Sequence, residues 1–182
     1  MSTLKVSTIS PLGTDATKTI TIGSAGDTVA GAGANTPAFM AKSTSDQTFS
    51  LGAYTKATLD TVELDTHSAF ANSRFTVPTG EGGKYSISID GSLQNSAAAR
   101  EKWLLIFING VQSETLESRI RLSDNYFNGG SSFRTSATGV VNLSAGDYVE
   151  IYGLVNASSG TPQFNGGGGG QLNFAGYKII GA

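Results

Sequence analysis

The chain has 182 residues, enough for one domain with an appended segment, and carries a net charge of −2 with 14% charged residues. So few charges provide no basic field that would attract nucleic acid or a membrane surface, and we expect no partner of either kind. The absence of cysteine excludes disulfides and thiolate metal sites, and a single histidine excludes a multi-histidine metal site.

Residues 1–36 differ in composition from the rest of the chain. They are rich in Thr, Ser, Gly and Ala and contain no aromatic side chain. Such a segment cannot offset the entropy cost of ordering by itself, so we expect an extended anchor or stalk that packs on other chains. A disordered tail is the alternative. The first residues contain no apolar segment of signal-peptide length, and we expect synthesis in the cytoplasm.

From Pro37 onward, short alternating segments rich in β-branched and aromatic residues predict strands. The clearest alternation is Lys84–Asp90, whereas Trp103–Ile108 is apolar on both faces and should contact the core on one side and another protein surface on the other. Asn109-Gly110 predicts a two-residue hairpin turn. The predicted strands are 38–42, 47–50, 58–65, 74–76, 83–93, 101–108, 114–122, 132–143, 147–155 and 172–180. About ten short strands over residues 37–182 predict an all-β sandwich or jelly roll.

Five fragments within residues 37–182 resemble the C1q/TNF-like family and occur in that family's order. They are Pro37–Ala41, Phe70–Pro78 with Gly83–Ile87, Leu105–Gly110, Leu143–Ile151 and Phe174–Ile180. The chain differs from animal members because it has no collagen-like stalk and no cysteine. Its opening, Ser2–Ile9, resembles the openings of phage fibre proteins.

The resemblance implies a ten-stranded jelly roll that assembles as a compact homotrimer and binds protein or carbohydrate without being an enzyme. We therefore expect a virion structural protein, a trimeric phage fibre, adhesin or decoration head that projects from the particle and contacts the host surface. Residues 1–36 would bind other virion proteins. The alternatives are a decoration or stalk-capping protein without a receptor, and a C1q-like binding module of a bacterial surface protein. A depolymerase enzyme ranks below these, because the chain is too short for a long β-helix.

The strands carry more aromatic side chains than one sandwich core needs. Surplus aromatic residues on strands are typical of subunit interfaces, so we expect several of them to be buried between the copies of a trimer. The alternative is that all of them lie in the core of one subunit. The predicted interface residues are Phe39, Tyr54, Trp103, Phe107, Tyr152, Phe174 and Tyr177.

Two segments rich in Gly, Asn and aromatic residues are predicted to form loops at the tip of the domain. Their side chains suit stacking on sugar rings or contact with protein, with simple turns as the alternative. The predicted receptor-contact residues are Tyr126, Phe127, Asn128, Phe164, Asn165 and Gln171. The glycine run 166–170 lacks the Lys-Ser/Thr ending of a phosphate-binding loop.

Asp60, Glu63, Asp65 and His67 are weak candidates for a metal site. On a strand the last three would share one face, and carboxylates with an imidazole could hold a divalent cation. A solvated strand face is the favoured interpretation, so we expect no metal and no cofactor. The remaining carboxylates are scattered, and no pair stands out for acid–base catalysis.

Overall fold

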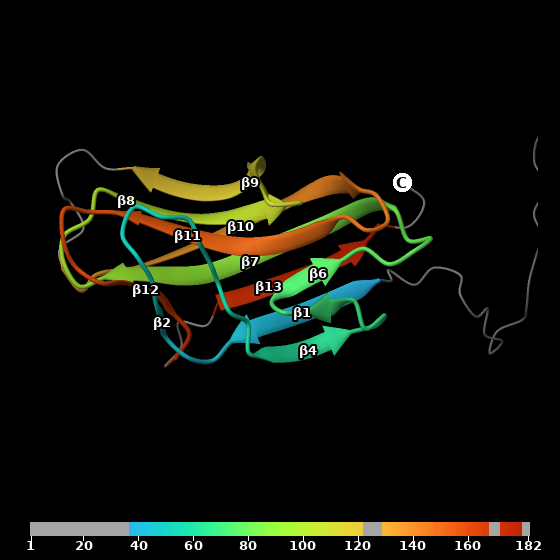
Figure 1. Cartoon of the computed structure of the whole chain (residues 1–182), viewed down its shortest axis with the longest axis horizontal. Helices are drawn as coiled ribbons and strands as arrows, with labels where there is room; N and C mark the ends of the chain where they lie inside the picture. The colour runs from blue at the N-terminus through green and yellow to red at the C-terminus, as the bar shows by residue number, and fades with distance from the viewer. Residues whose placement is uncertain (1–36, 122–128, 168–171, 180–182) are drawn as a thin grey trace, which may run out of the picture. The chain divides into compact units, whose positions relative to one another are not determined.

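The structure is a computed structural model that describes residues 37–121, 129–167 and 172–179, and within β9 it describes side chains as far as Leu116. These residues form thirteen strands, β1–β13, in two antiparallel sheets, and none of them is helical (Figure 1). In the described ranges no helix therefore has the length and apolar character to span a membrane. The predicted all-β class is confirmed.

The first sheet contains seven strands. Six follow the order β2-β12-β7-β13-β1-β4, and β10 pairs with β7 along its other edge. The strands are β1 (Ala38–Ser43), β2 (Gln47–Thr48), β4 (Thr61–Asp65), β7 (Gly83–Asn95), β10 (Ser132–Leu143), β12 (Pro162–Asn165) and β13 (Leu172–Lys178). The alternation predicted for Lys84–Asp90 places Tyr85, Ile87 and Ile89 in the core.

The second sheet contains six strands in the order β5-β6-β11-β8-β9, and β3 pairs with β11 beyond the end of β6. They are β3 (Thr55–Lys56), β5 (Phe70–Ala71), β6 (Arg74–Thr76), β8 (Glu101–Ile108), β9 (Val111–Arg121) and β11 (Tyr148–Asn156). The hairpin predicted at Asn109-Gly110 is confirmed: both residues have positive φ, 53° and 77°, and join β8 to β9.

The core between the two sheets is centred on aromatic rings. Phe39 stacks on Phe75 at 4.3 Å between ring centroids and meets Phe174 edge-on at 4.8 Å. Gly176 makes this packing possible, because a Cβ there would lie 2.7 Å from the Phe39 ring. Burial of each of these phenylalanines contributes on the order of 2 kcal/mol.

The strands missed by the sequence analysis are short. β3 and β5 have two residues each and β12 has four, which is too short for alternation to be recognised. The predicted strand 47–50 shrinks to β2, and the predicted strand 58–65 begins only at Thr61. In the opposite direction, β9 starts at Val111 instead of residue 114, because the tight turn allows pairing immediately after Gly110.

Candidate functional site

Exposed apolar side chains are concentrated on the first sheet. Among the described residues, seven large hydrophobic side chains are exposed, and five of them belong to strands of this sheet, with exposed fractions between 36% and 58%. These five are Met40, Val62, Leu64, Val140 and Tyr177. The remaining two, Tyr54 and Val111, belong to the region of the second sheet. A contiguous exposed apolar face is the usual mark of an interaction surface.

Two adjacent rows of side chains cross the outer face of the first sheet. From β10 to β1, the first row contains Val140, Ser86, Tyr177 and Ala38. From β10 to β4, the second row contains Thr138, Ser88, Ala175, Met40 and Leu64. Neither row contains a charged residue, and between the larger apolar groups the side chains are small. We call these two rows the flat face.

Charged side chains next to the flat face lie beyond its two ends. Arg134 pairs with Asp90, and Lys42 pairs with Glu63, beyond the second row. At the opposite end the exposed Lys84 lies on the same side of β7 as Ser86, next to the first row. An uncharged centre with a charged rim is the pattern that protein–protein interfaces show.

A second surface lies on the outer side of the other sheet. Here four aromatic rings are in contact, and we call them the aromatic strip: Tyr54, Trp103, Phe107 and Tyr152. Tyr54 lies 6.4 Å from Trp103 and 5.5 Å from Phe107, and Phe107 stacks on Tyr152 at 4.1 Å, measured between centroids. The outer side of β8, predicted to be apolar on both faces, therefore contributes Trp103 and Phe107 to this strip.

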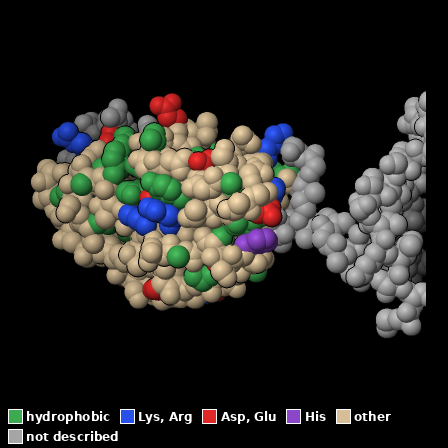
Figure 2. All heavy atoms as spheres, turned by 45° about the vertical axis from the view of Figure 1, so that its right-hand side comes forward, with side chains coloured by type: hydrophobic (Ala, Val, Ile, Leu, Met, Phe, Trp, Pro, Cys, Tyr) green, Lys and Arg blue, Asp and Glu red, His purple; other side chains and the backbone are tan. Residues whose placement is uncertain are grey.

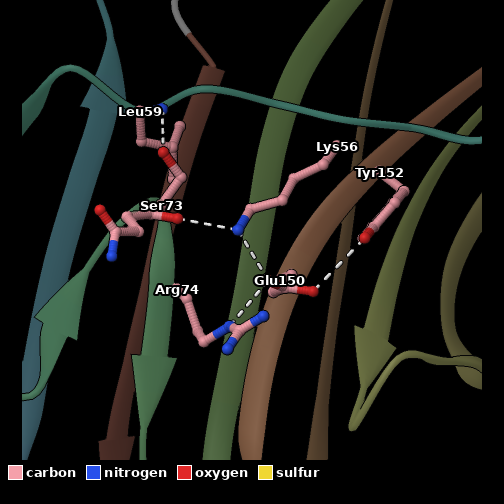
Figure 3. A network of polar contacts seen from close by, with 7 residues as sticks. Lys56, Leu59, Ser73, Arg74, Glu150 and Tyr152 are labelled. Atoms are coloured by element: carbon pink, nitrogen blue, oxygen red, sulfur yellow. Dashed lines mark hydrogen bonds and ion pairs between the residues drawn. The ribbon is translucent and has the colours of Figure 1, made fainter.

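The aromatic strip adjoins three charged side chains, the ionic cluster of Lys56, Arg74 and Glu150 (Figure 3). Lys56 Nζ and Arg74 Nε donate to the same oxygen of Glu150 at 2.7 and 2.8 Å, and the Tyr152 hydroxyl donates to the other at 3.4 Å. The Arg74 guanidinium also lies over the Tyr148 ring, 3.9 Å from its centroid.

Electrostatics keeps the ionic cluster charged. Burial alone would raise the pKa of Glu150, but hydrogen bonds from Lys56 and Arg74 outweigh burial and lower the pKa below its ordinary value. The pKa of Tyr152 is raised by burial and by the nearby Glu150 charge, so its hydroxyl stays protonated as a donor. Figure 2 shows a face of the molecule where a group of basic side chains lies among hydrophobic and uncharged ones.

The seven predicted interface residues fall into three different places. Phe39 and Phe174 are buried between the sheets, so they offer no surface to another copy and their assignment to an interface is wrong. Tyr177 lies on the flat face. The other four form the aromatic strip on the opposite sheet, so the seven do not make up one surface.

The predicted receptor-contact residues are corrected where the structure describes them. Phe164 belongs to the core and packs on Phe49 at 4.7 Å between centroids, instead of lying at a loop tip. Asn165 is buried at the end of β12, where its amide donates to Ser92 and Ser132. Four predicted contacts lie outside the described residues: Tyr126, Phe127, Asn128 and Gln171.

The weak metal candidates have separate structural roles. Asp60 accepts hydrogen bonds from the backbone N–H and the hydroxyl of Thr44, and Glu63 pairs with Lys42. Asp65 accepts the backbone N–H groups of Ala69 and Phe70 at 2.9 Å, which closes the turn that contains His67. In the described part of the chain, no group of three potential metal ligands comes together.

The sequence analysis missed most of the flat face and the whole ionic cluster. The sequence pattern could have indicated Met40, because it stands between Phe39 and Ala41 and makes its strand apolar on both sides, as in Trp103–Ile108. No sequence pattern could have indicated the ionic cluster, because Lys56, Arg74 and Glu150 come from three separate strands.

No family model and no curated protein matches the sequence. Among solved structures, the chain is similar to the globular domain of zebrafish complement 1qA protein, with TM-score 0.55 and 17% identity over 79% of this chain and 98% of that one. It is also similar to Eiger TNF from S. frugiperda, with TM-score 0.57 and 10% identity over 80% of this chain and 93% of that one. For murine APRIL the TM-score is 0.54 and the identity is 10% over 78% of this chain and 99% of that one. The fold is thus a C1q/TNF-like jelly roll.

Proposed function

We propose that this chain is a non-enzymatic binding module that associates with copies of itself, as a homotrimer, through the flat face. The observation that carries the proposal is the placement of four of the seven exposed large hydrophobic side chains, Met40, Leu64, Val140 and Tyr177, on the flat face. The C1q/TNF-like fold supports three as the number of copies, since the family it resembles assembles in that way.

The chemistry of the flat face suits a permanent contact. Small side chains in its middle, such as Ser88 and Ala175, allow another surface to approach closely, while Met40, Tyr177 and Val140 supply apolar area. A closed threefold assembly uses a heterologous contact, in which the flat face of each copy meets a different surface of the next. Carboxylates accounted for by structural hydrogen bonds, such as Asp60 and Asp65, support a role other than catalysis.

Light scattering coupled to size exclusion tests the self-association. Wild-type protein should elute with three times the chain mass, and Tyr177→Asp should lower the mass, because a carboxylate buried between copies without a partner costs several kcal/mol. Val111→Asp is the matched control, since Val111 is more exposed than Tyr177 and lies away from the flat face. A monomeric wild type, or a folded Tyr177→Asp variant that keeps the wild-type mass, would contradict the proposal.

We further propose that the module belongs to a virus particle, as a phage fibre, adhesin or decoration head anchored by residues 1–36. The resemblance of Ser2–Ile9 to phage fibre openings supports this placement. Antibody labelling of intact particles tests it, and loss of incorporation on deletion of residues 1–36 tests the anchor. Binding of the purified protein to host cells separates an adhesin from a pure decoration or stalk-capping protein. Labelling of a bacterial surface instead of particles would favour the bacterial binding module.

A further inference from the structure

The aromatic strip and the ionic cluster form one continuous surface on the second sheet. Tyr152 links them, because its ring stacks on Phe107 while its hydroxyl donates to Glu150. Tyr54 ends the strip on the solvent side with 46% of its surface exposed. This surface belongs to the sheet opposite the flat face and shares no residue with it.

The ionic cluster has positive charge to offer to a ligand. Glu150 is 3% exposed and already accepts three hydrogen bonds, so it has little capacity left for a ligand. Lys56 and Arg74 are 30% and 40% exposed, and two cations against one carboxylate leave a local charge of about +1.

Arg74 is the side chain best placed to use this charge. Its Nε is held by Glu150 and its guanidinium plane by the Tyr148 ring, and neither terminal nitrogen makes a hydrogen bond with any residue that the structure describes. A fixed guanidinium with two available donors matches the geometry of a carboxylate.

The surroundings favour a sugar over a protein partner. Where side chains are described, Val111 is the one large aliphatic group exposed on strands of this sheet, so this surface offers few aliphatic contacts to a protein partner. The exposed ring of Tyr54 and the partly buried ring of Tyr152, beside charged donors, suit a ligand with an apolar C–H face and a polar edge. A pyranose ring has both, and its C–H face stacks on aromatic rings.

We propose that this surface binds acidic carbohydrate, with a sugar ring against the aromatic strip at Tyr54 and Tyr152 and the sugar carboxylate accepting hydrogen bonds from Arg74. The inference deepens the proposed binding role by naming a ligand class and a site for it. It does not depend on the flat face, so either can fail without the other.

Isothermal titration of the full-length protein with uronic-acid trisaccharides tests the site. Tri-galacturonate and tri-mannuronate are the acidic probes, and neutral mannotriose is the matched control ligand. We expect at least one acidic probe to bind, binding to weaken as salt rises, and mannotriose to bind at least about tenfold more weakly.

Three variants assign the contacts. Tyr54→Ala and Arg74→Lys should each weaken binding of the acidic probe about tenfold, the first by removing the stacked ring and the second by replacing the planar fork with a point charge. Val111→Ala should leave the affinity unchanged. Thermal melts of each variant separate loss of binding from loss of folding.

Each result has one consequence. Absence of binding at millimolar probe, equal binding of mannotriose, or folded Tyr54→Ala and Arg74→Lys variants with wild-type affinity overturns the acidic-sugar site. If Tyr54→Ala lowers the oligomer mass measured by light scattering, the acidic-sugar site is also overturned, because the aromatic strip would then be a contact between subunits. A change of mass in Tyr177→Asp with unchanged sugar affinity supports both proposals separately.

Discussion

Replacement of Glu150 by glutamine should destabilise the fold measurably. The carboxylate is 3% exposed and holds two cations at 2.7 and 2.8 Å, and an amide of the same shape cannot offset their charges. Breaking a buried ion pair by removing one partner costs about 3–5 kcal/mol. Lys56 and Arg74 are partly exposed and can regain water, so we expect a smaller cost than for a fully buried pair, about 2–3 kcal/mol.

The loss of stability in Glu150→Gln should depend on pH in a defined direction. The pKa of Glu150 is lower in the folded state than in the unfolded chain, so the stabilisation is complete above the unfolded pKa of about 4.3 and is lost as the pH falls through the folded pKa. The difference between wild type and Glu150→Gln should therefore be large at neutral pH and shrink in acid. Glutamine does not titrate, so the variant lacks this part of the acid sensitivity.

Urea unfolding followed by circular dichroism at fixed protein concentration measures both effects. Glu63→Gln is the matched control, because it makes the same change in a pair whose carboxylate, at 38% exposed, is far more accessible to water, and it should cost less than about 1 kcal/mol. The reasoning is wrong if Glu150→Gln costs no more than Glu63→Gln at neutral pH, or if its cost is the same in acid.

Three further changes test other parts of the structure by the same unfolding measurement. Burial lowers the pKa of Lys102 from 10.5 to about 8, which penalises the folded state by about 3 kcal/mol at neutral pH. The free energy of unfolding should therefore rise as the pH increases from about 8 to 10.5, and Lys102→Met should reduce this rise. Ser73→Ala should cost about 1–3 kcal/mol, because the Ser73 hydroxyl accepts the buried N–H of Leu59 at 2.8 Å. Gly153→Ala should cost about 1–3 kcal/mol, since its Cβ would lie 2.5 Å from the Phe164 ring.

Strand patterns and turn residues were enough to predict an all-β sandwich or jelly roll, and the resemblance of five fragments specified the C1q/TNF-like type. Alternation in Lys84–Asp90 identified the core side chains of β7, and Asn109-Gly110 located a hairpin, because both signals depend on neighbouring residues alone. The two-residue strands β3 and β5 could not be predicted, since they exist only through pairing with strands far along the chain. The same limit applies to Asn72-Ser73, a tight turn with positive φ at both residues but without glycine.

The surfaces were less predictable than the fold for a geometric reason. The sequence shows that a strand has two apolar sides, but which side faces the core depends on the opposite sheet. Phe39 and Met40 illustrate this, because the first is in the core and the second is exposed. The number of aromatic residues indicated more apolar side chains than one core needs. It could not show that Tyr177 and Tyr152 lie on different sheets.

The division of exposed groups between the two sheets has a consequence for binding strength. If the flat face of each copy meets a surface of the next copy other than the aromatic strip and the ionic cluster, these two stay available in every copy. Each such surface is small and open, so one copy would hold a sugar weakly. Three identical sites on one rigid assembly raise the effective concentration at a repetitive polysaccharide and can increase avidity by about 10²–10⁴ without any new contact. Under the two proposals, self-association on one sheet would make weak recognition on the other sheet effective.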